Sequence, residues 1–69
     1  MKISARNILK GKIVELKRGA VMAQVVVELP GGNRIASAIF VESVDDLGLK
    51  VGDEVLAVVK STDVMIARP

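Results

Sequence analysis

Short runs of alternating apolar and polar residues, separated by turn residues, dominate the chain and predict β-strands. The clearest run covers residues 21–29, where every odd-numbered position is apolar and where Gln24 and Glu28 stand between apolar neighbours. Pro30-Gly31-Gly32-Asn33 follows and predicts a hairpin turn, because glycine adopts positive φ without strain. Over the whole chain, the pattern predicts strands at residues 8–17, 21–29, 34–41, 54–61 and 64–67.

One segment, Ser43 to Gly48, interrupts the strand pattern and predicts a single helical turn. Ser43 is a suitable N-cap, and Gly48 is a suitable stop. Three strands, one short helix and two further strands match a five-stranded Greek-key barrel of the oligonucleotide/oligosaccharide-binding (OB) type. We therefore expect one domain over residues 1–69, all-β with one short helix and an OB-like barrel. Gly11, inside the first strand, indicates a bulge or a close approach of two backbones.

Several strands carry apolar residues on both faces, which a barrel of this size cannot hide. In the second strand, Met22 and Val26 alternate with Val25 and Val27. A chain of 69 residues has a marginal core, and this one contains no Cys or His for a disulfide or a zinc site. We therefore expect a homo-oligomer with apolar interfaces.

The composition argues against several classes of function. The chain lacks Cys, His, Tyr and Trp, and no catalytic motif joins its Ser, Lys and carboxylate residues, so we expect no enzyme. Phe40 is its only aromatic residue, so nucleic-acid binding by base stacking is a minor alternative. No apolar run approaches the ~18–20 residues of a membrane helix, and the N-terminus does not resemble a signal peptide. These features predict a cytoplasmic protein without membrane contact, and a net charge of +2 adds a mild preference for anions.

Two short polar segments carry the candidate chemistry. Ser4-Ala5-Arg6-Asn7 precedes the first long strand and combines three kinds of hydrogen-bond donor. Lys60-Ser61-Thr62-Asp63 puts a cation and hydroxyls at a strand end, where backbone N–H groups become free, and such donors suit an oxyanion. Each segment alone also fits a simpler interpretation. The first can be a solvated terminus, and the second an ordinary turn in which Ser61, Thr62 or Asp63 bonds its own backbone.

Taken together, the two segments and the strands between them resemble the molbindin family, small cytoplasmic molybdenum-pterin-binding proteins built from a single Mop (TOBE-like) domain. The resemblance covers the whole chain, and its first and last segments are the most specific. Ile8 stands where the family commonly has Gln. The residues that carry the resemblance are Ile3-Ser4-Ala5-Arg6-Asn7, Leu9-Lys10-Gly11-Lys12-Ile13, Gly31-Gly32-Asn33 with Ile35 and Ser37, Ser43-Val44 with Leu47-Gly48, and Val58 to Ile66.

This resemblance implies a ligand, an assembly and two kinds of site. The ligand is molybdate or tungstate, held between the subunits of a homohexamer built as a trimer of dimers, with no organic cofactor. The Ser-Ala-Arg segment of one subunit and the Lys-Ser segment of another line the main site, and a second class of site lies on or near the threefold axis. On this chain, the main-site residues are Ser4, Ala5 (through its backbone), Arg6, Lys60 and Ser61, and the second-site residues are Gly19, Ala20 and Ser37.

The chemistry of the ligand agrees with this set of residues. Molybdate at neutral pH is a dianion with four acceptor oxygens and no proton, so its ideal cage contains donors only. A carboxylate in the cage would accept the proton of a protonated phosphate, so we expect Asp63 to turn away and cap its own turn. The predicted role is molybdenum storage or homeostasis, and the residues do not distinguish storage, buffering and delivery. The main alternative is a ligand-free oligomerisation or interaction module of the same fold.

Overall fold

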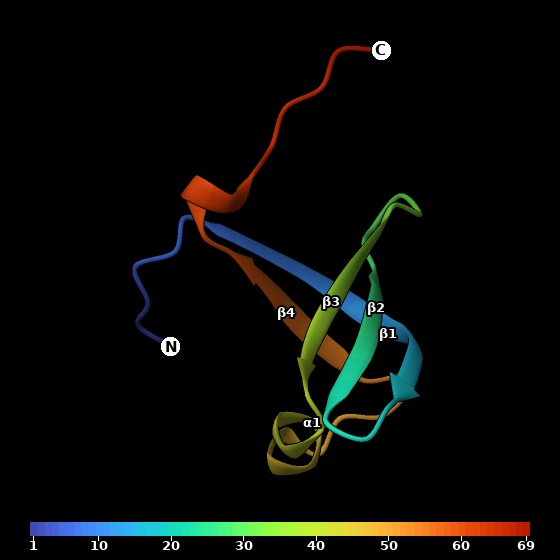
Figure 1. Ribbon diagram of the computed structural model, residues 1–69. Coiled ribbons are helices and arrows are strands. Elements are labelled where there is room, and N and C mark those ends of the chain that lie inside the picture. Colours follow the sequence, from blue (N-terminus) through green and yellow to red (C-terminus); the bar gives the residue numbers. More distant parts are fainter.

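The chain folds into one strongly curled antiparallel sheet with a short helix at one end (Figure 1). A computed structural model describes all residues, 1–69. The sheet order is β3-β2-β1-β4, so the edges of β3 and β4 are unpaired and the sheet forms a half-barrel. The elements are β1 (Asn7–Arg18), β2 (Met22–Glu28), β3 (Arg34–Phe40), α1 (Val41–Leu47), β4 (Glu54–Val59) and the 3₁₀ turn η1 (Ser61–Asp63). None of its helices is long and apolar enough to cross a membrane.

The long strand β1 joins the two halves of the sheet. Its first half pairs with β4 and its second half pairs with β2, and Lys12 is opposite a residue of each. A bulge lies between Ile13 and Glu15, where the strand bends. A Cβ atom on Gly11 would lie 2.6 Å from the carbonyl oxygen of Glu28, so the close backbone approach expected at Gly11 is confirmed, and the bulge falls a few residues later.

The core lies inside the curl and is small. Its buried residues come from β1, β2 and α1, with Val44 closing the helical end. The helix begins at Val41, and its N-cap is Phe40, which makes no side-chain hydrogen bond. The predicted cap at Ser43, three residues later, is therefore wrong. Gly48 ends the helix in the left-handed conformation at φ 63°, as the sequence predicts. The buried core residues are Ile13, Ala23, Val25, Val27 and Val44.

The prediction of a fifth strand at residues 64–67 is wrong for the isolated chain. After η1 the chain is extended but pairs with no strand, and it leads away from the barrel (Figure 1). Met65 and Ile66 are 92% and 91% exposed. The all-β class with one short helix and an OB-like architecture is confirmed, but within one chain the barrel has four strands and stays open between β3 and β4.

Candidate functional site

The two polar segments singled out in the sequence lie at the same end of the molecule. At this end Asn7 of β1 is opposite Val59 of β4, and the Asn7 side-chain amide donates a hydrogen bond of 3.2 Å to the Val59 carbonyl oxygen. The chain before Asn7 and the chain after Val59 therefore leave the sheet next to each other, as Figure 1 shows for the N-terminal segment and η1. The paired register ends there, and Arg6 and Lys60 are the residues that directly adjoin this last pair in the chain.

The charges at this end are not compensated within the chain. Five of the ten basic residues form ion pairs with nearby carboxylates, and neither Arg6 nor Lys60 is among them. The paired ones are Lys10, Lys17, Arg18, Arg34 and Lys50. Ser61 follows Lys60 directly, and Ser4 lies two residues before Arg6, so each unpaired cation has a hydroxyl donor near it in the chain. Donors of these types suit an anion.

The acidic residue of this end, Asp63, does not behave as expected. Backbone bonds alone close its turn: the Asp63 N–H donates to the Lys60 carbonyl oxygen at 2.9 Å, and the Val64 N–H donates to the Ser61 carbonyl oxygen at 3.4 Å. The turn has no side-chain cap, so the cap predicted for Asp63 is wrong. Its exposed carboxylate carries a negative charge three residues from Lys60.

The donor group is open to solvent in the single chain. Ser4, Arg6, Lys60 and Ser61 are all exposed, and Ala5 is half-buried. An anion bound by these residues alone would keep much of its hydration, and its attraction to the two cations would be screened by water and salt. A tight site at this end therefore requires further burial, which this chain does not supply.

The residues proposed for a second site are not brought together. Gly19 and Ala20 form an exposed turn before β2, closed by a 2.8 Å hydrogen bond from the Gly19 N–H to the Met22 carbonyl oxygen. Ser37 lies in the middle of β3, three residues from Phe40, which is the partner of Met22. At about 3.3 Å per residue the separation along the strand is about 10 Å. A site that uses both places requires more than one chain.

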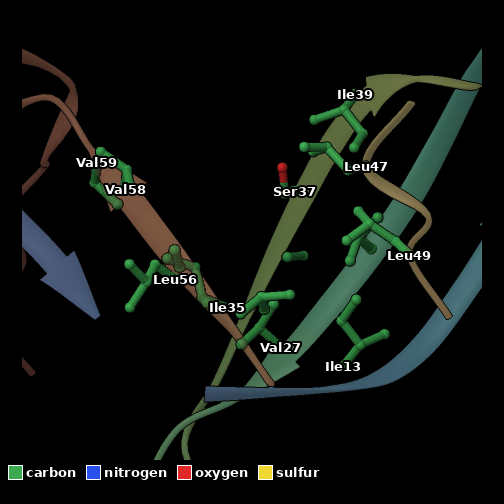
Figure 2. Close-up of a pocket in the computed structure, with 14 residues that line it drawn as sticks. Ile13, Val27, Ile35, Ser37, Ile39, Leu47, Leu49, Leu56, Val58 and Val59 are labelled. Carbon is green, nitrogen blue, oxygen red and sulfur yellow. The ribbon is translucent and has the colours of Figure 1, made fainter. Parts of the chain in front are cut away.

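A large apolar groove lies between the open edges of the half-barrel, and the sequence did not locate it. Its volume is about 380 Å³, and 13 of its 14 lining residues are hydrophobic. Figure 2 shows Leu56 and Val58 of β4 on one side and Ile35 and Ile39 of β3 on the other. Ser37 is its one polar residue. The signal that pointed to it was the excess of apolar residues on both faces of the strands.

Apolar side chains are also exposed on the outer face of the β2–β3 hairpin. Met22 and Phe40 face each other across the two strands and are 44% and 59% exposed. Val26, expected on the same outer face, is buried. Apolar residues are thus exposed on both faces of the sheet, as expected, most clearly at the open end of this hairpin and in the groove.

Comparisons with known proteins agree with this architecture. The model of the TOBE domain family matches residues 3–66. Molybdenum-pterin-binding protein 2 of Clostridium pasteurianum is 64% identical over 66 residues, which are 96% of this chain and 97% of that protein. A molybdate-binding protein from Sporomusa ovata has a TM-score of 0.92 at 41% identity, over 99% of this chain and all of that chain.

A second solved structure is similar over part of a longer chain. It is the cytoplasmic molybdate-binding protein ModG with molybdate bound, at a TM-score of 0.84 and 51% identity, over 88% of this chain and 43% of the ModG chain. These relatives share both the sequence and the curled sheet described above. The chain therefore belongs to the TOBE domain family, and within it to the molbindins, the small molybdenum-pterin-binding (Mop) proteins.

Proposed function

We propose that this protein binds molybdate, and also tungstate, at the end of β1 and β4. The observation that supports this most directly is the meeting of two donor segments there, with Arg6 and Lys60 free of ion pairs. The proposed ligands are Ser4, the Ala5 backbone N–H and Arg6 of one subunit, together with Lys60 and Ser61 of another. The relatives support the identity of the anion, because they are named for molybdate or molybdenum-pterin.

The donor types fit a dianion that carries no proton. Lys60 supplies a compact charge with three rotatable donors, whereas the planar guanidinium of Arg6 can bridge two oxygens. The Ser4 and Ser61 hydroxyls and the Ala5 N–H add neutral donors. This role is one of binding and release, so we propose a function in cytoplasmic molybdenum storage or homeostasis and no catalytic activity.

We further propose that the working form is a homohexamer built as a trimer of dimers, with the anions held between subunits. The exposure of Ser4, Arg6, Lys60 and Ser61 in one chain supports this, because another chain can bury these side chains around the anion. The Gly19-Ala20 turn and Ser37 then belong to a second site to which several chains contribute near the threefold axis.

The contact within each dimer is proposed to be the C-terminal segment of one chain in the groove of another. Val64 to Ala67 has no partner in its own chain, and Met65 and Ile66 expose apolar side chains. The groove, in turn, has no strand to cover it. The edges of β3 and β4 beside it are unpaired, and its walls are apolar. A strand placed there would cover the groove and pair with an open edge.

The test of the binding site is calorimetric titration of the full chain with molybdate, tungstate, sulfate and phosphate. Replacing Lys60 with Ala should weaken molybdate binding by about 2–5 kcal/mol if the anion is buried between subunits. Lys12→Ala is the matched control, because Lys12 is also an exposed lysine without an ion pair but lies in the middle of β1.

Equal affinities in Lys60→Ala and the parent would contradict the site. A stable oligomer that binds none of the four anions would instead favour the ligand-free interaction module.

A further inference from the structure

One side-chain hydrogen bond joins the two donor segments of each chain at their bases. The side-chain amide of Asn7 donates to the carbonyl oxygen of Val59 at 3.2 Å, across 52 residues of chain. Asn7 directly follows Arg6, and Val59 directly precedes Lys60. On each strand, the bond therefore lies one residue away from a proposed cationic ligand.

This bond is the last link between the two segments. Asn7 and Val59 form the end pair of strands β1 and β4, and no hydrogen bond joins residues 1–6 to residues 60–69. Outside this pair one segment bends, and the other turns into η1 (Figure 1). The separation of the two segments is therefore set at this pair.

The bond is also unlike the other side-chain hydrogen bonds of the protein. Those bonds all involve a charged side chain in an exposed place. Asn7 and Val59 are half-buried, and both the amide and the carbonyl are neutral. Salt screens attraction between exposed charges, whereas a bond between neutral groups has little charge to screen. Such a bond can hold a distance beside charged ligands at any ionic strength.

In the proposed assembly, the two donor segments of one chain belong to different anions. The Ser4-Ala5-Arg6 segment completes one site with a neighbouring chain, and the Lys60-Ser61 segment completes another. Each chain thus offers two half-sites, and their spacing is set within that chain although each anion lies between chains. An error in this spacing displaces donors at two sites, and a rigid shift of the chain cannot correct both.

We propose that Asn7 is a positioning residue for the oxyanion sites: its hydrogen bond to Val59 fixes the spacing of the two half-sites that each chain offers to its neighbours. This inference rests on the proposed binding site, and it gives Asn7 no contact with the anion. In metal sites, replacing a residue that orients a ligand costs about 10–100-fold in affinity. Molybdate and sulfate are tetrahedral dianions that differ in size, so correct spacing of the donors should favour molybdate.

The experiment titrates the full chain with molybdate by calorimetry and measures sulfate by competition at constant ionic strength. Asn7→Leu keeps a side chain of similar size without the donor, and Asn7→Ala removes the donor without adding an apolar group. We expect both variants to bind molybdate at least about tenfold more weakly. Sulfate should lose less affinity, so the ratio of the two affinities should fall.

Gly11→Ala is the matched control, because it strains the same strand at a place with no proposed ligand. It should destabilise the barrel and leave both anion affinities unchanged. Native mass spectrometry on the same samples reports assembly. Asn7 variants that lose both affinities equally, or that no longer assemble, would show that the bond serves stability or subunit contacts, and either result overturns the positioning role.

A structure of the parent protein with molybdate bound gives a readout that needs no variant. The Asn7 amide should still donate to the Val59 carbonyl oxygen, with no oxygen of the anion within hydrogen-bond distance. An amide that turns from Val59 to the anion would be a ligand, which overturns the proposal.

The calorimetric outcomes also separate this inference from the binding site itself. Unchanged molybdate affinity in both Asn7 variants overturns the positioning role and leaves the site intact. A parent protein that binds no molybdate overturns the site, and the role of Asn7 with it.

Discussion

The carboxylate of Asp63 is exposed and lies three residues after Lys60, one of the proposed anion ligands. A carboxylate beside a dianion site is repulsive, which is why Asp63 was expected to cap its own turn. The turn closes instead through backbone hydrogen bonds alone. The negative charge of Asp63 therefore weakens the attraction of Lys60 for an anion. The contrast shows what sequence can supply at this scale. Donor types at Ser4, Arg6, Lys60 and Ser61 could be read directly, but side-chain rotation within a four-residue turn could not.

We expect Asp63→Asn to tighten molybdate binding, because it removes a negative charge near the anion. Exposed charge pairs contribute about 0.2–1 kcal/mol, so the gain should be up to about fivefold at low salt and smaller at high salt. Titration at two ionic strengths measures it, with Glu42→Gln as a control of equal charge change on α1. Weaker binding in Asp63→Asn would mean that the carboxylate supports the site.

Gly11 gives a second prediction at the same scale. A Cβ at this position would lie 2.6 Å from both the Glu28 carbonyl oxygen and the Val27 Cγ1 atom, and the first of these is backbone. Gly11→Ala should therefore lower the free energy of unfolding by about 1–3 kcal/mol, through overpacking. Chemical denaturation measures it, and Lys12→Ala, one position along the same strand, should have little effect. A Gly11→Ala protein as stable as the parent would show that β1 and β2 can separate at this point at little cost.

At the scale of elements, the sequence identified the order of strands and the hairpin turn but not which segments pair. Residues 64–67 have the composition of a strand, but in the isolated chain they pair with no neighbour. A single sequence does not show which segment would pair with them. The same limit applies to the helix. Ser43 is a good cap by type, but Val41 follows β3 without a break, and packing of Val44 against the core decides where the helix lies.

The C-terminal segment can be tested separately from the anion. In the isolated chain Met65 and Ile66 are more than 90% exposed, so the double variant Met65→Asp/Ile66→Asp should leave the barrel folded. If the segment occupies a second copy's groove, the same variant should dissociate the assembly, because it buries charge among apolar walls. Sedimentation and circular dichroism measure the two effects.

The matched control for that variant is Arg68→Asp. It changes the net charge by the same two units in the same segment, without removing an apolar side chain, and should leave the assembly intact. A double variant that assembles like the parent would contradict the proposed contact.

At the scale of the whole molecule, the surplus of apolar residues was visible in the composition, and it predicted an oligomer without locating its contacts. The structure divides this surplus between the groove and the exposed hairpin residues Met22 and Phe40. The sequence could not make that division, because it depends on the curl of the sheet and on which edges stay open. The same holds for the charged residues. The sequence shows that ten residues are basic, but only the fold shows that five of them form ion pairs and that Arg6 and Lys60 do not.

The pairing of β1 with β4 also has a consequence for the order of folding. The hairpins β1–β2 and β2–β3 join neighbours in the chain, whereas Asn7 and Val59 are 52 residues apart, and closing so long a loop is slow. The donor segments therefore come together after the hairpins have formed. An anion that binds only this late structure should leave the folding rate nearly unchanged and reduce the unfolding rate. The anion would then prolong the lifetime of the native state without helping the chain to reach it.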